Sequence, residues 1–227
     1  MRQDLTDISV VLDRSGSMEA VRADTIGGFN NFLDTQKKQP GEALLTLMQF
    51  DTEFDLVHSG RNVRDVPALT QDTFVPRGLT ALLDAIGRTI NATGARLSAM
   101  PEEQRPSKVL FVIMTDGFEN SSKEFHEPQI NDMINAHRTK YSWEFVFLGA
   151  NQDAIKTAAS MGIPQKTSMT YATNAIGTQN VFRSASILAS TYRATGQAAF
   201  TDEDRRKQTE AGAHGTVTSS STPRPAA

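Results

Sequence analysis

The sequence predicts an α/β fold built on a doubly wound, Rossmann-like sheet. The sheet is expected to be mostly parallel, with one antiparallel edge strand and helices on both faces. Apolar segments of strand length alternate with amphipathic segments of helical periodicity, which is the pattern of a parallel sheet covered on both sides. The first strand segment is a nearly continuous apolar run, as expected for a strand buried on both faces. Two further strand segments are joined by a short polar turn, which predicts a hairpin at one edge of the sheet.

Six segments are expected to be strands. Residues 7–13 form a mainly apolar, β-branched run bounded by polar residues. Residues 43–50 and 53–58 flank the polar turn Asp51-Thr52 and form the expected hairpin. The remaining expected strands cover residues 108–114, 143–148 and, as a short last strand, 167–171.

Five segments have helical periodicity. In residues 18–38 apolar side chains recur on one face, and the basic pair Lys37-Lys38 followed by Pro40-Gly41 indicates the end of a helix. A second long amphipathic helix is expected over residues 79–97, and a polar loop follows it. Further helices are expected over residues 127–139, 153–161 and 173–195.

The chain of 227 residues is expected to form one folded domain over residues 1–198 and a polar, flexible C-terminal tail over residues 199–227. The tail is rich in charged residues and then in Ser, Thr, Pro and Ala. Such a composition offers too little apolar surface to offset the entropy lost on ordering.

Composition and charge describe an ordinary soluble globular protein, with 38% hydrophobic and 22% charged residues. The 23 basic and 26 acidic side chains leave a net charge of −3. This balance gives no electrostatic basis for binding nucleic acid or an anionic membrane. We therefore expect neither as a partner.

The chain contains no cysteine, which excludes disulfides and thiolate chemistry. Its first residues are polar, and the apolar run that follows is too short for the core of a signal peptide. No segment approaches the length of a membrane span. These features lead us to expect a cytoplasmic protein.

Oxygen-bearing side chains follow the first strand at a regular spacing. Asp13 ends the strand, and Ser15 and Ser17 follow at intervals of two residues. A carboxylate and alternating hydroxyls in a turn can point into one small volume. Neutral oxygens with few carboxylates suit Mg²⁺ or Mn²⁺ better than Zn²⁺. The segment therefore predicts part of a site for a divalent cation.

Two later segments supply further candidate oxygens. Thr80 stands where a Gly-containing loop enters a helical pattern, and Asp116-Gly117 ends a second apolar strand. In doubly wound sheets, ligands bind beyond the carboxyl ends of the strands, where the direction of the connections reverses. If the strands ending at Asp13 and Asp116 are neighbours there, both carboxylates face one crevice.

Together the three segments resemble the von Willebrand factor A family. The metal-ion-dependent adhesion site (MIDAS) of that family has the sequence Asp-x-Ser-x-Ser, then a distant Thr, then a distant Asp followed by Gly. The matching residues are Asp13, Ser15, Ser17, Thr80 and Asp116. The resemblance covers residues 5–195, and its one departure is Gly78-Leu79, where many relatives have Gly-Gly.

The resemblance implies a protein-binding module for adhesion or assembly that has no catalysis of its own. A cation held by the five residues, Mg²⁺ or alternatively Mn²⁺ or Ca²⁺, would bind an Asp or Glu of a partner protein. Two alternatives remain open: a structural subunit of a larger assembly, or a Mg²⁺-dependent phosphohydrolase. The oligomeric state and the identity of the partner are not predicted.

Each candidate residue also has a purely structural interpretation. Asp13 and Ser15 could cap the first helix, and Thr80 could cap the second. Asp116-Gly117 could be a plain turn. Three nearby acids, Asp51, Asp84 and Glu119, are expected to be solvated, although any of them could bind a metal-bound water. Phe118 is either a contact for a partner or part of the packing of its loop.

Other kinds of site are poorly supported. The histidines have neither the i, i+4 spacing nor the cysteine company of a zinc site; they are His58, His126, His137 and His214. The Gly-x-Ser-x-Gly sequence of serine hydrolases is absent. An aspartyl-phosphate enzyme would need an acid two positions after its nucleophile, where this chain has Ser15.

Overall fold

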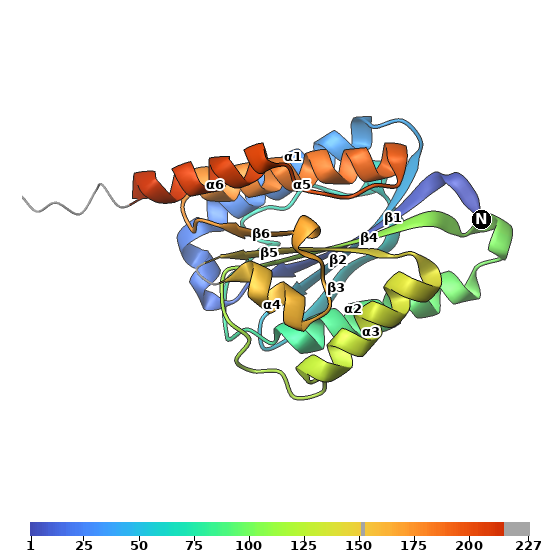
Figure 1. Cartoon of the computed structure of the whole chain (residues 1–227), viewed down its shortest axis with the longest axis horizontal. Coiled ribbons are helices and arrows are strands. Elements are labelled where there is room, and N and C mark those ends of the chain that lie inside the picture. Colours follow the sequence, from blue (N-terminus) through green and yellow to red (C-terminus); the bar gives the residue numbers. More distant parts are fainter. Residues whose placement is uncertain (151–152, 216–227) are drawn as a thin grey trace, which may run out of the picture.

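The structure is a computed structural model that describes residues 1–150 and 153–215. Within these ranges, six strands form one sheet in the order β3-β2-β1-β4-β5-β6 (Figure 1). All neighbouring strands are parallel except the hairpin of β2 and β3. The strands are β1 (Arg2–Asp13), β2 (Glu42–Phe50), β3 (Phe54–Asn62), β4 (Pro106–Thr115), β5 (Glu144–Ala150) and β6 (Ser168–Tyr171). The predicted fold class is therefore confirmed, including the antiparallel edge strand.

Helices cover both faces of the sheet (Figure 1). One face carries α1 (Arg22–Lys38), α5 (Ala175–Thr195) and α6 (Asp202–Gly215), and the other carries α2 (Leu82–Ala99), α3 (Glu127–Tyr141) and α4 (Ala154–Ser160). Among the described helices, none is both long enough and apolar enough to cross a bilayer.

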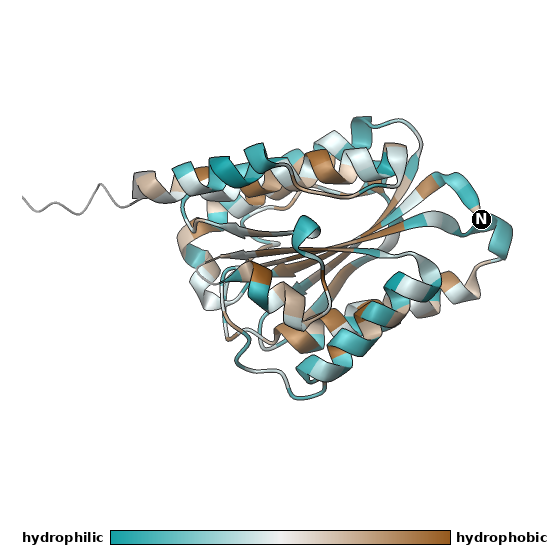
Figure 2. Ribbon diagram, viewed as in Figure 1, coloured by the Kyte–Doolittle hydropathy of each residue, from teal (hydrophilic) through white to brown (hydrophobic). Residues whose placement is uncertain are grey.

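The central strand β1 contributes to two separate cores. Every residue from Leu5 to Asp13 is buried. Because side chains alternate between the faces of a strand, Ile8, Val10 and Leu12 pack in the core under α1 and α5, whereas Val11 packs under α2 and α3. Figure 2 shows the resulting apolar centre of the sheet between helices with more polar outer surfaces.

One ion pair is buried on the α2 side of β1. Asp7 is fully buried, and Arg96 Nη2 of α2 lies 2.8 Å from its Oδ2 atom. Burial raises the pKa of Asp7, although the Arg96 charge opposes this shift. Gly60 on β3 makes room for the arginine, because a Cβ there would lie 2.7 Å from Arg96 Cζ. Gly60 also has a positive φ of 60°, which favours glycine.

The first predicted helix begins differently from the expectation. Residues Gly16–Val21 form a 3₁₀ helix, and the α-helix starts only at Arg22 instead of residue 18. Met18 and Val21 are the buried residues of this turn. Their three-residue spacing suits a 3₁₀ helix, which has three residues per turn.

Within the expected C-terminal tail, residues 202–215 form helix α6, which the composition did not predict. Its start is stabilised by Asp204, whose carboxylate accepts hydrogen bonds from Thr201 N at 2.9 Å and from Ser184 Oγ of α5 at 2.6 Å. Ala211 is buried against the rest of the domain. Polar contacts therefore dock a helix whose composition alone did not indicate order. The expected tail over residues 216–227 lies outside the described residues.

We predict that Arg96→Leu lowers the free energy of unfolding by about 3 kcal/mol at neutral pH, because the buried Asp7 carboxylate loses its counter-charge. In the variant, the pKa of Asp7 in the folded state stays above its unfolded value, so the loss shrinks as the pH falls and Asp7 binds a proton. Urea unfolding at several pH values measures both effects.

The double variant Asp7→Val/Arg96→Leu is the control for this prediction. It removes both charges, and we expect it to recover most of the lost stability. A double variant as unstable as Arg96→Leu would show that the arginine acts through packing and not through the carboxylate.

Candidate metal site

The candidate site lies at the carboxyl ends of β1 and β4, in the middle of the sheet. These strands are parallel neighbours, with Leu12 opposite Met114. Asp13 is the last residue of β1, and Asp116 directly follows β4. The order of the strands reverses between β1 and β4, and doubly wound sheets bind their ligands at such a point. The two carboxylates are therefore brought together as predicted.

The Asp13 carboxylate is fully buried and anchors the turn that follows β1. Its Oδ1 accepts a hydrogen bond from Ser15 N at 2.6 Å, and its Oδ2 accepts one from Thr115 Oγ1 at 2.6 Å. Burial raises the pKa of Asp13 to about 6, while the hydrogen bonds from Thr115 and Ser15 oppose the shift. Among the residues that the structure describes, this buried carboxylate forms no ion pair.

The two serine hydroxyls connect the turn to Asp116. Ser15 Oγ and Ser17 Oγ are 3.2 Å apart, and Ser17 Oγ donates to Asp116 Oδ1 at 2.6 Å. Burial raises the pKa of Asp116, and the hydrogen bond from Ser17 opposes this shift. Ser15 precedes the 3₁₀ helix, but its side chain makes no capping hydrogen bond. The hydroxyl therefore faces Ser17 instead of capping a helix.

Thr80 reaches the same region from a loop that precedes α2. The helix starts at Leu82, later than the predicted residue 79, and Thr80 does not cap it. The loop is held by Asn120, whose Oδ1 accepts from Thr80 N at 2.9 Å. A Cβ added at Gly117 would lie 3.2 Å from Thr80 Oγ1 and 3.8 Å from Ser17 Oγ. Both hydroxyls thus lie beside Gly117, in a space that a larger residue would fill.

This arrangement fits a hard divalent cation. Ligands at 2.0–2.1 Å in an octahedron lie about 2.9 Å from one another. The Ser15–Ser17 and Ser17–Asp116 oxygen separations of 3.2 and 2.6 Å bracket that value. Oxygen-only ligands suit Mg²⁺, Mn²⁺ or Ca²⁺. The candidate site has two carboxylates and three hydroxyls. In the part of the chain that the structure describes, there is no other kind of metal site built from three or more His, Cys, Asp or Glu residues.

The acids around the site were expected to be solvated, but they are buried or half-buried and stabilise the loops of the site. Asp84 is buried and accepts hydrogen bonds from the backbone of Lys123, Glu124 and Phe125. Glu119 is half-buried and accepts from Leu83 N and from the backbone of the residues that follow it. These carboxylates therefore satisfy backbone N–H groups of the loop after β4.

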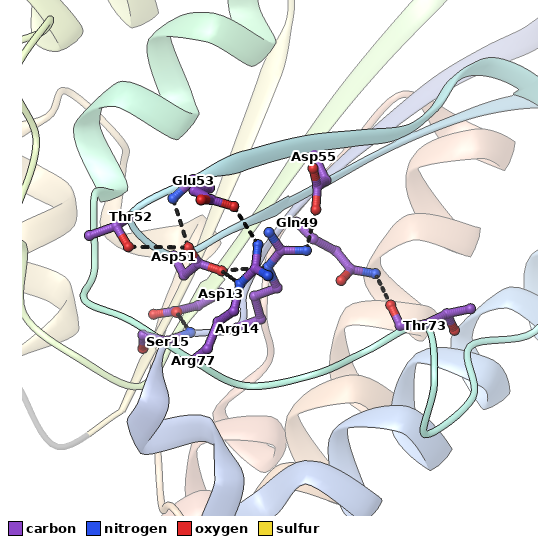
Figure 3. Close-up of polar contacts among 10 residues, drawn as sticks. All are labelled: Asp13, Arg14, Ser15, Gln49, Asp51, Thr52, Glu53, Asp55, Thr73 and Arg77. Atoms are coloured by element: carbon purple, nitrogen blue, oxygen red, sulfur yellow. Dashed lines mark hydrogen bonds and ion pairs between the residues drawn. The ribbon is translucent and has the colours of Figure 1, made fainter.

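Asp51 is also buried, with 1% of its side chain exposed. It binds Arg14 and Arg77, which the sequence reasoning did not include in the site (Figure 3). Both arginines lie within three residues of a candidate ligand, Arg14 beside Asp13 and Arg77 before Thr80. Basic residues so close to a cation site need acidic partners, and that requirement is the signal that could have identified them.

Two apolar side chains are exposed next to the site. Leu79, which precedes Thr80, is 53% exposed, and Phe118, which follows Gly117, is 63% exposed. Their loops are joined by a hydrogen bond from Asn120 N to Thr80 O. Most of the Phe118 side chain is therefore open to solvent.

No family model and no curated protein sequence matches this chain. Several solved structures are similar to it. Proximal thread matrix protein 1 from the mussel byssus is 16% identical, with a TM-score of 0.55 over 82% of this chain. The chain covers 46% of that mussel protein. A further structure of the mussel protein, with a zinc-occupied MIDAS motif, is 15% identical with a TM-score of 0.53.

Two other structures show the same likeness. A von Willebrand factor type A protein from Catenulispora acidiphila is 13% identical, with a TM-score of 0.53 over 82% of this chain and 42% of that chain. The SpRpn10 VWA domain is 12% identical, with a TM-score of 0.51 over 78% of this chain and 93% of that chain. The protein thus has the fold of von Willebrand factor A domains.

Proposed function

We propose that this protein is a metal-dependent protein-binding module and not an enzyme. A divalent cation, Mg²⁺ or alternatively Mn²⁺ or Ca²⁺, would be held at the carboxyl ends of β1 and β4. The observation that carries the proposal is the convergence there of oxygen-bearing side chains from three distant segments. The proposed ligands are Asp13, Ser15, Ser17, Thr80 and Asp116.

The charge of the ligand set supports binding of a partner carboxylate. Three of the five proposed ligands are neutral hydroxyls, and Asp13 is already bound by Ser15 N and Thr115 Oγ1. A cation in this shell would act as a Lewis acid for a further oxygen ligand. The exposed apolar residues Leu79 and Phe118 offer contact area for a protein beside that position.

The Asp13 environment argues against an aspartyl-phosphate enzyme. Both carboxylate oxygens accept hydrogen bonds, and the side chain is fully buried. The neighbouring arginines that could bind a phosphate are instead paired with Asp51, Asp55 and Glu53. The arginines are therefore not free to bind a phosphate in this arrangement.

We predict that Mg²⁺ or Mn²⁺ raises the Tm of the wild-type protein, because ligands that bind the folded state stabilise it. Asp116→Ala should lose this response while keeping the circular dichroism of the wild type. Asp132→Ala, which removes an exposed acid on α3, is the matched control and should respond like the wild type. An equal response of the wild type and Asp116→Ala would refute the assigned ligands.

The partner carboxylate can be tested with a peptide pair on the Mn²⁺-loaded protein. Acetyl-Leu-Asp-Leu-amide should displace Mn²⁺-bound water and lower the water-proton relaxation rate, whereas the Asn-containing peptide should not. Phe118→Ala should weaken binding of the Asp peptide without changing Mn²⁺ affinity, because its ring lies outside the ligand set. The same response to both peptides would contradict recognition of a carboxylate.

Two measurements distinguish the alternative functions. Gel filtration with and without EDTA would reveal a metal-dependent assembly of identical chains. Mg²⁺-dependent hydrolysis of p-nitrophenyl phosphate that is lost in Asp13→Ala would overturn the proposed binding function and indicate an enzyme.

A further inference from the structure

A buried carboxylate lies between two of the segments that carry the proposed metal ligands. Asp51 follows β2, and its Oδ2 accepts hydrogen bonds from Arg14 Nε at 2.7 Å and from Arg77 Nε at 2.9 Å (Figure 3). Its Oδ1 accepts from Glu53 N at 2.7 Å. One carboxylate therefore binds two arginines from different loops and fixes its own turn.

These arginines belong to the metal-site loops. Arg14 stands between Asp13 and Ser15, and Arg77 begins the loop that leads to Thr80. The backbones of the two loops also pair, with Arg77 N donating to Arg14 O at 2.8 Å and Gly16 N donating to Gly78 O at 3.2 Å.

Asp51 is also joined to the Thr80 loop through its backbone. Its carbonyl oxygen accepts from Ala81 N at 3.1 Å. Gly78 passes close to this turn, since a Cβ there would lie 2.6 Å from Thr52 Oγ1 and 3.4 Å from Asp51 Oδ1. Its φ of 65° also favours glycine. The Thr80 loop thus approaches the Asp51 turn as closely as a glycine permits.

The other acids bound to the arginines are exposed. Arg14 Nη1 lies 2.5 Å from Asp55, and Arg77 Nη2 lies 2.6 Å from Glu53, but these acids are 55% and 72% exposed. Exposed pairs contribute little free energy. Burial alone would raise the pKa of Asp51. Hydrogen bonds from Glu53 N, Arg77 and Arg14 lower the pKa by more than burial raises it, so the net shift is downward. Asp51 is thus the buried, ionised acid that both arginines share.

From these contacts we infer that Asp51 is a positioning residue for the metal site proposed above, on which this inference rests. By binding Arg14 and Arg77 together, it fixes the distance between the turn that carries Ser15 and Ser17 and the loop that carries Thr80. It also offsets two positive charges that would otherwise repel a cation. Groups outside the ligand shell that orient metal ligands commonly change metal affinity by 10–100-fold.

The test is Mn²⁺ affinity measured by calorimetry. We expect Asp51→Asn to weaken Mn²⁺ binding by about tenfold. Asp55→Asn and Glu53→Gln remove exposed partners of the same arginines and serve as matched controls. Both should change the affinity by less than about twofold, since exposed pairs contribute little.

A double-mutant cycle separates positioning from a general loss of stability. If Asp51 acts by holding Thr80 in place, Asp51→Asn should weaken Mn²⁺ binding much less in a Thr80→Ala background than in the wild type. If Asp51→Asn does not fold, Arg77→Gln, which removes the half-exposed arm of the same contact, takes its place in the cycle.

The outcomes are distinct. Absence of Mn²⁺ binding by the wild type would refute the proposed function itself. Wild-type binding with unchanged affinity in Asp51→Asn would leave the proposed function standing and overturn the role of Asp51. Equal losses in the wild-type and Thr80→Ala backgrounds would overturn positioning of Thr80.

Discussion

The parallel pairing of β1 with β4 is the constraint on which the candidate site depends. These strands lie side by side in the middle of the sheet, so their carboxyl ends place Asp13 and Asp116 next to each other although 102 residues separate them in sequence. Thr115 reinforces this junction, because the last residue of β4 donates to the carboxylate that ends β1. The backbone ladder thus determines where the two acids meet, and the loops only bring hydroxyls to that place.

The buried carboxylates in this part of the fold have pKa values that are shifted in opposite directions. Its carboxylates lie beside the ends of buried strands, where loss of water raises the pKa of Asp13 and Asp116. In the turn after β2, Asp51 is also shielded from solvent, but it accepts hydrogen bonds from two guanidinium groups and a backbone N–H, and its pKa is lowered. Hydrogen bonds from its two arginine partners contribute to this downward shift, whereas Asp13 and Asp116 form no ion pair among the described residues.

Most of the sheet could be predicted from sequence because its strands are marked by apolar composition. The run that contains Ile8 and Val11 is too apolar for any surface position, and the turn after Phe50 is clearly polar. The five candidate ligands could be predicted to converge because a motif resemblance and strand ends agreed. The role of Asp51 could not, since a lone acid in a polar turn gives no sign that two distant arginines will enclose it. Helix α6 was missed for a similar reason: the contact between Ser184 and Asp204 that docks it joins side chains with no common pattern.

Helix α6 has a further effect at the outer edge of the sheet. Within the described residues, β6 has only four residues and pairs with β5 alone. Arg205 of α6 donates to the carbonyl oxygens of Ser168 and Gln165, at 2.8 and 2.7 Å. Carbonyl groups on an edge strand can otherwise recruit a strand from another molecule and start aggregation. Gln165 precedes β6, whereas Ser168 is its first residue, so the charged side chain of Arg205 occupies a carbonyl group of this edge strand and discourages pairing with another strand there.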